Sequence, residues 1–132
     1  MAKKTNQSIV EQGSSGNPFM APWERIPDGE PRVFTEFNTG KQRLYVYGSH
    51  DTIDRDFCGY DHVVWSASVD DLTNWRHDGV AFHINQLEGL TFVSENGKKI
   101  TFHPGQERLY APDVIYHPQR NIYLMFVFTS ES

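Results

Sequence analysis

A β-hairpin pattern that occurs twice is the feature of this sequence that most constrains the fold. In each copy a proline begins a short β-prone strand, a turn follows, and a second strand rich in aromatic residues returns. The first copy comprises residues 31–34 and 44–49, and the second comprises residues 112–115 and 124–129. Because a unit that recurs along a chain is typical of repeat architectures, the pattern predicts repeated antiparallel β units. A β-sandwich with two similar hairpins is the alternative that this pattern leaves open.

Further strand candidates lie between the two copies. Residues 62–68 and 80–83 have strand-like composition, and residues 70–75 between them predict a short turn or helical corner. Four antiparallel strands in succession form a meander, which is one blade of a β-propeller. An Asn-Gly pair at 96–97 predicts a separate hairpin before the second copy. The predicted fold is therefore all-β, with about one and a half propeller blades built from antiparallel four-stranded meanders.

Composition agrees with this fold class and narrows the possible partners. The chain contains nine Phe, six Tyr and three Trp, which favour strands over helices. Its net charge is −5 with acids and bases interspersed, so nothing supports a nucleic-acid partner. The one cysteine, Cys58, cannot form an internal disulfide and is predicted to be a structural bystander. No apolar run predicts a membrane span or a secretory signal, so we expect a cytoplasmic location.

The sequence divides into two parts. Residues 1–16 are polar, end in Gly-Ser-Ser-Gly and predict a flexible leader. Residues 17–132 are predicted to form one folded unit. Because the second hairpin copy stops near residue 132, we expect an incomplete second blade with an open strand edge. Such edges are normally covered, so self-association or a partner segment is expected there.

Two acidic residues occupy similar positions beside the prolines of the two copies. Glu30 directly precedes Pro31, and Asp113 directly follows Pro112. In a propeller the innermost strand of each blade lines a common channel, so these carboxylates are expected to converge. Convergent carboxylates are what glycoside hydrolysis requires. From spacing alone, Glu30 is better explained as a solvated turn residue.

Several segments resemble the beginning of glycoside hydrolase family 43 enzymes. The resemblance runs from about residue 17 to the end of the chain, and the order and spacing of the segments are more specific than any one of them. Residues 26–34 read Ile-Pro-Asp-Gly-Glu-Pro-Arg-Val-Phe and residues 45–51 read Tyr-Val-Tyr-Gly-Ser-His-Asp. Residues 64–75 resemble the family's Trp-Ser-Ser-x-Asp-Leu-x-x-Trp segment, and Tyr-Ala-Pro-Asp-Val at 110–114 resembles its Trp-Ala-Pro-Asp-Val segment.

The resemblance implies an arabinofuranosidase-like or β-xylosidase-like five-bladed β-propeller. The implied activity is inverting hydrolysis of arabinofuranosides or xylosides in plant polysaccharides, with an oligo- or polysaccharide as substrate and no required cofactor. By this resemblance Glu30 is the general base, with Asp28 as the alternative if the register differs. Asp113 corresponds to the acid that orients the general acid and modulates its pKa. The general acid itself is expected in a later blade, and Glu131 does not fit its motif, so we expect negligible hydrolysis by this polypeptide alone.

Three further residues are candidates for substrate binding. His50 and Asp51 follow a strand end, and Trp23 offers a flat apolar face to a sugar ring. For each of them a simpler structural role, in a polar loop or in packing of the N-terminal arm, is also compatible with the sequence. The six histidines show no metal-ligand spacing, so no metal site is predicted, although some members of the family hold calcium in the channel.

Two other interpretations compete with a family 43 hydrolase. The first is a non-catalytic carbohydrate-binding module or degenerate propeller fragment. The second is another furanose-active propeller of the invertase type, whose Trp-x-Asn-Asp-Pro-Asn-Gly opening is absent here.

Overall fold

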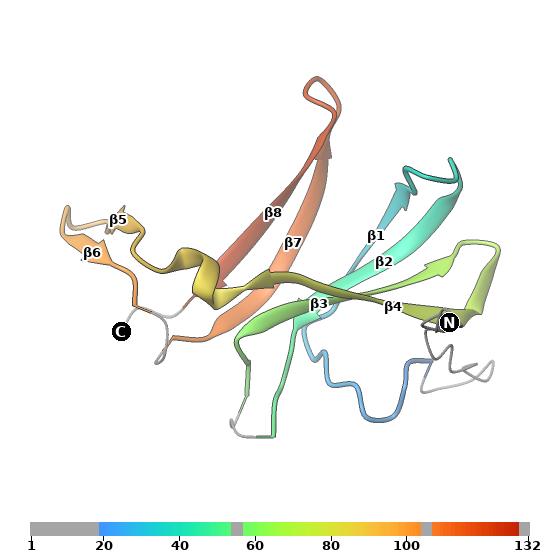
Figure 1. Ribbon diagram of the computed structural model, residues 1–132, viewed down its shortest axis with the longest axis horizontal. Helices are drawn as coiled ribbons and strands as arrows, with labels where there is room; N and C mark the ends of the chain where they lie inside the picture. The colour runs from blue at the N-terminus through green and yellow to red at the C-terminus, as the bar shows by residue number, and fades with distance from the viewer. Residues whose placement is uncertain (1–18, 54–56, 104–106, 130–132) are drawn as a thin grey trace, which may run out of the picture.

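The computed structural model describes residues 19–53, 57–103 and 107–129, and the predicted leader at 1–16 lies outside these ranges. Within them the structure is all-β apart from one short 3-10 helix, and all strand pairs are antiparallel, as predicted. Figure 1 shows a four-stranded sheet, a long hairpin beside it and a small hairpin at one end. The elements are β1 (Glu30–Thr35), β2 (Gln42–Ser49), β3 (Asp61–Ser68), β4 (Asp71–His83), η1 (Ile84–Leu87), β5 (Thr91–Val93), β6 (Lys99–Thr101), β7 (Leu109–His117) and β8 (Ile122–Thr129).

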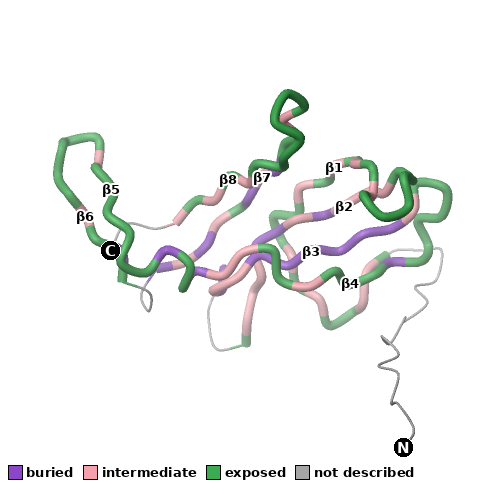
Figure 2. The backbone as a smooth tube through the Cα atoms, turned by 45° about the horizontal axis from the view of Figure 1, so that its top comes forward, coloured by how far each residue is buried: buried purple, intermediate pink, exposed green. Residues whose placement is uncertain are grey.

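The four-stranded sheet is the predicted meander, with strand order β1-β2-β3-β4. The β1–β2 turn closes because Gly40 adopts a φ of 69°, and its N–H donates to the Glu36 carbonyl at 2.8 Å. Strand β3 is central and buried on both faces, as Figure 2 shows in purple. Since side chains alternate along a strand, β3 contributes to two separate layers of contacts.

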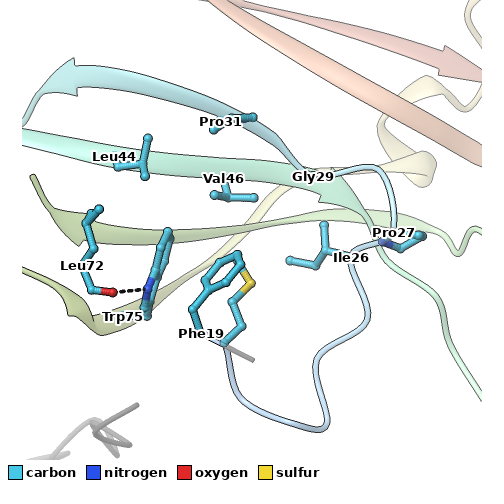
Figure 3. Close-up of a pocket in the computed structure, with 10 residues that line it drawn as sticks. Phe19, Ile26, Pro27, Gly29, Pro31, Leu44, Val46, Leu72 and Trp75 are labelled. Atoms are coloured by element: carbon cyan, nitrogen blue, oxygen red, sulfur yellow. Dashed lines mark hydrogen bonds between the residues drawn. The ribbon is translucent and has the colours of Figure 1, made fainter. Parts of the chain in front are cut away.

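One face of the sheet carries the apolar core. Val46, Val63, Trp65, Ala67 and Trp75 form its buried cluster, and the arm before β1 packs Met20, Ala21 and Ile26 against it. Beside this cluster lies a groove of about 490 Å³ with mainly apolar walls (Figure 3). Its lining residues are Phe19, Met20, Ile26, Pro27, Gly29, Pro31, Leu44, Val46, Leu72 and Trp75.

The predicted turn or helical corner at 70–75 is wrong in its extent. The turn is confined to residues 69–70, and β4 begins at Asp71. Asp71 still makes a local turn, because its carboxylate accepts from the Thr73 N–H at 3.0 Å and the Thr73 hydroxyl at 2.6 Å. The ladder therefore skips from Asp71 to Trp75, which pairs with Ala67 and is buried in the core. Burial of this indole keeps the segment in the sheet despite its turn-like composition.

The opposite face of the sheet receives the β7–β8 hairpin. Strand β7 contacts β1, β2 and β3. The Phe34 and Tyr123 rings meet edge to face with centroids 4.9 Å apart, and the ring Nε2 of His62 lies 2.8 Å from the Tyr110 carbonyl oxygen. One complete meander followed by a two-stranded hairpin is consistent with one propeller blade and the first half of another.

The small hairpin β5–β6 agrees with the Asn-Gly prediction, and Gly97 has the positive φ of 79° that such a turn needs. A second apolar cluster lies near it, where Ile84, Leu87, Phe102 and Leu109 are buried together. In the described part of the chain no strand pairs with the outer edge of β8, where Phe126 and Phe128 are exposed. That a partner or second copy covers this edge stays a prediction.

Gly48 in β2 allows the arm to reach the sheet. A Cβ at this position would lie 1.7 Å from the Cγ2 of Ile26 and 3.2 Å from the Cα of Gly29. We expect Gly48→Ala to lower the free energy of unfolding by about 1–3 kcal/mol or more, because the arm and β2 must move apart. Urea unfolding with Gln42→Ala, an exposed change in the same strand, as control provides the measurement. Equal stability of the two variants would contradict this contact.

Candidate functional site

Arg32 brings the two predicted acids together. Its Nη2 lies 2.8 Å from the Asp113 Oδ1, and its Nη1 forms an ion pair with the Glu30 Oε1. Glu30 and Asp113 are therefore close enough to share one guanidinium, although they are 83 positions apart in the sequence. Their side chains are 41% and 40% exposed, so water and a ligand can reach both carboxylates.

Local strand geometry explains this meeting. Glu30 and Arg32 are two residues apart in β1 and therefore share a face. In β7 the ladder passes from Tyr110 to Asp113 with a register shift, so that two residues stand opposite one. One of them is Pro112, which has no N–H to donate to the ladder. Such a bulge re-aims the side chains that follow it, and Asp113 is the first paired residue after it.

Asp28, the alternative base, lies two residues before Glu30, just outside β1. Its Oδ2 accepts a hydrogen bond of 3.1 Å from the hydroxyl of Ser49, which is fully buried at the end of β2. Asp28 itself is exposed. It has no ion pair with Arg32 among the contacts of the described residues. The buried Ser49 hydroxyl thus binds one oxygen of the Asp28 carboxylate, and the exposed Asp28 side chain remains accessible to solvent.

Cys58 lies behind Asp28, beside Ser49. Its backbone N–H donates to the Asp51 Oδ1 at 2.7 Å, and its φ is 50°. Burial raises the pKa of the Cys58 thiol, and the nearby charges of Asp28 and Asp51 raise it further. The thiol is therefore protonated at neutral pH, which agrees with the predicted structural role. Asp51 contributes to this corner through its contact with the Cys58 backbone.

Tyr47 stands directly opposite Glu30 in the β1–β2 ladder and shares its face. Burial raises the pKa of Tyr47 to about 12. The phenol therefore stays neutral over the whole physiological range and keeps a proton to donate. Its ring stacks near that of Tyr45 with centroids 6.2 Å apart, which adds a small aromatic wall beside the carboxylates.

His50 and Trp23 are not brought to this cluster. The His50 Nδ1 lies 2.8 Å from the Asp61 Oδ1, and its Nε2 lies 3.5 Å from the Glu24 Oε1. Trp23 packs on Trp65, with ring centroids 5.7 Å apart, on the face that carries the apolar core. Both residues thus have structural partners away from Asp113, and their roles in substrate binding stay predictions.

The sequence analysis missed three contributors to the site, Arg32, Tyr47 and Ser49. A usable signal existed for Arg32, because Glu-Pro-Arg in a strand places an acid and a base on one face. Ser49 and Tyr47 offered no comparable signal. Their importance depends on which strand lies opposite β1.

The described residues contain no group of three or more His, Cys, Asp or Glu side chains arranged to hold a metal ion. The calcium ion that the resemblance allows stays a prediction, and no step is assigned to a metal. In the same part of the chain no helix is long and apolar enough to cross a membrane.

Comparison with known proteins gives one informative match. No family model matches the chain, and no solved structure matches it. A curated protein from Thermoclostridium stercorarium named xylosidase/arabinosidase is 40% identical over 112 residues, which cover 84% of this chain and 20% of that protein. The chain thus spans about a fifth of the length of this relative. Over most of its own length it is related to a protein named as a glycosidase.

His62 joins the sheet to β7 at the edge of the site. It is fully buried, its Nε2–H donates to the Tyr110 carbonyl, and its Nδ1 has no hydrogen-bond partner among the described residues. Burial lowers the pKa of His62 below 6.5, although the Tyr110 carbonyl and Asp61 act in the opposite direction. The folded state therefore binds a proton less readily than the unfolded state.

We expect the stability linked to His62 to be fully present above pH 6.5 and to be lost as the pH falls below it. His62→Gln keeps an N–H donor without a titrating ring. It should therefore reduce the loss of unfolding free energy between about pH 7 and pH 5. Urea unfolding at a series of pH values measures this, with the exposed His103→Gln as control. An unchanged pH slope in the His62 variant would contradict the assignment.

Proposed function

We propose that this chain is part of a family 43 glycoside hydrolase that cleaves arabinofuranosides or xylosides of plant polysaccharides by single displacement. The observation that carries the proposal is that Glu30 on β1 and Asp113 on β7 share the Arg32 guanidinium, while Asp28 lies two residues before Glu30 and is held by Ser49. The 40% identity to a protein named xylosidase/arabinosidase supports the same reaction class. Inversion requires one carboxylate to activate water and a second acid to protonate the leaving oxygen.

The geometry favours Asp28 over Glu30 as the general base. A base must lie within hydrogen-bond reach of the attacking water, and a carboxylate engaged by an arginine offers fewer free lone pairs to that water. Glu30 is paired with Arg32, whereas Asp28 accepts one neutral hydrogen bond from Ser49 and faces solvent. The buried Ser49 hydroxyl fixes the carboxylate without supplying a compensating charge. In this scheme Glu30 orients the guanidinium of Arg32 through their ion pair.

Asp113 fits the role of the orienting acid. It lies on the inner strand of the second hairpin, and its Oδ1 also accepts from the Val114 N–H at 2.6 Å. A carboxylate fixed by Arg32 and by the Val114 N–H provides a preorganised negative charge in the site, which can orient the general acid. The general acid is proposed to come from a part of the enzyme beyond the described residues. Inverting sites place it roughly 6.5–9.5 Å from the base.

A chimera tests this function and separates the two candidate bases. The 112 matched residues of the Thermoclostridium stercorarium protein are replaced by those of this chain, and kcat is measured on aryl xyloside and aryl arabinofuranoside. We expect an active chimera in which Asp28→Asn lowers kcat by about 10²–10⁴, the usual contribution of a general base. Glu30→Gln should cost much less, and Asp113→Asn should lower kcat with little change in KM.

The opposite ranking, a large loss for Glu30→Gln and a small loss for Asp28→Asn, would assign the base to Glu30. An inactive chimera together with sugar binding by this chain would favour the non-catalytic carbohydrate-binding alternative. We expect the 132-residue polypeptide assayed alone to show negligible hydrolysis, because it spans only about a fifth of its relative.

A further inference from the structure

Arg32 occupies the junction between the two inner strands. Its guanidinium contacts Glu30 on its own strand, the Pro31 carbonyl at 3.0 Å and Asp113 on β7 at 2.8 Å. Among the ion pairs of the described residues, Arg32–Asp113 is the one that joins β7 to the four-stranded sheet. The planar fork of an arginine holds two carboxylates in a fixed relative orientation, which a lysine cannot do.

Stability is a poor explanation for this arrangement. The side chain of Arg32 is 35% exposed, and ion pairs at such positions contribute little to the free energy of unfolding because water screens them. Apolar and buried contacts, such as Phe34–Tyr123 and His62–Tyr110, already dock the β7–β8 hairpin on the sheet. What Arg32 adds is orientation. It holds the carboxylates of Glu30 and Asp113 on one guanidinium.

We propose that Arg32 is a positioning residue of the hydrolase site, which acts through Asp113, whereas Asp28 has no ion pair among the described residues. This inference rests on the proposed function, because it assigns Asp113 a role in the reaction. Arg32 does not exchange a proton in this scheme. Its contact with Asp113 is the largest of the effects that raise its pKa, so the guanidinium is charged at every pH at which the enzyme would work.

A matched control exists in the same sheet. Arg76 also bridges two carboxylates, with its Nη2 2.9 Å from Glu36 and its Nε 2.5 Å from Asp78, and its side chain is 46% exposed. It lies on β4, away from β7. Arg76→Met therefore removes the same kind of contact, at similar exposure, without touching Asp113.

The kinetic test uses the chimera and a double-substitution cycle. We expect Arg32→Met to lower kcat by at least about tenfold with little change in KM, because a misplaced group near the reacting atoms slows the chemical step. Arg32→Met combined with Asp113→Asn should lose no more activity than the stronger single variant, since both remove one unit. Arg32→Lys keeps the charge but should restore kcat only in part. Arg76→Met should leave kcat unchanged.

The second measurement uses this chain itself and needs no activity. The Val114 N–H donates to the Asp113 Oδ1, so its hydrogen exchange reports how firmly that carboxylate is held. We expect Arg32→Met to accelerate exchange at Val114 at least about tenfold more than Arg76→Met does.

The outcomes separate the two proposals. Multiplicative losses in the cycle, or an Arg32→Met chimera as active as the Arg76→Met chimera, would overturn the positioning role while the hydrolase function stands. An inactive unsubstituted chimera would count against the hydrolase function. The exchange experiment would then still decide whether Arg32 holds Asp113, and equal exchange in the two variants would overturn that contact.

Discussion

The β7–β8 hairpin meets the four-stranded sheet through contacts of three physical kinds. An aromatic pair joins Phe34 to Tyr123, a buried imidazole joins His62 to the Tyr110 carbonyl, and an ion pair joins Arg32 to Asp113. Apolar contact contributes most to the docking energy, while the polar contacts select one register. The meeting of the two predicted acids follows from this docking, because Asp113 shares a guanidinium with Glu30 only when β7 lies on this face.

The two faces of the sheet carry different side chains and have different roles. One is apolar, with the Val46–Trp75 cluster and the groove beside it, and it also holds the arm that leads to Asp28. The other carries the carboxylates, Arg32 and the tyrosines. Gly48 allows the arm that leads to Asp28 to pack on the sheet, because only a residue without a Cβ allows Ile26 to approach β2 so closely. Packing on the apolar face thus sets the position of a carboxylate on the polar face.

Environment also separates the roles of chemically similar acids. Glu30 and Asp113 are neutralised by Arg32, Asp28 is supported by a buried hydroxyl, and Glu24 is buried against the Trp65 indole. A carboxylate engaged by a fixed cation has fewer lone pairs free for water than one that accepts a single neutral hydrogen bond. This difference in partners supports the proposal that Asp28 is the general base.

The sequence by itself determined the all-β class, the order of the meander, the separate Asn-Gly hairpin and the two prolines beside which the acids lie, because turn chemistry and strand composition act over a few residues. It overestimated the turn at 70–75, where burial of Trp75 outweighed local preference. Only the tertiary structure decided that Arg32 joins Glu30 to Asp113, that Ser49 supports Asp28, and that His50 turns toward Glu24 and Asp61. These outcomes depend on which face meets β7 and on a one-residue shift in its ladder, and alternation along a single strand cannot specify either.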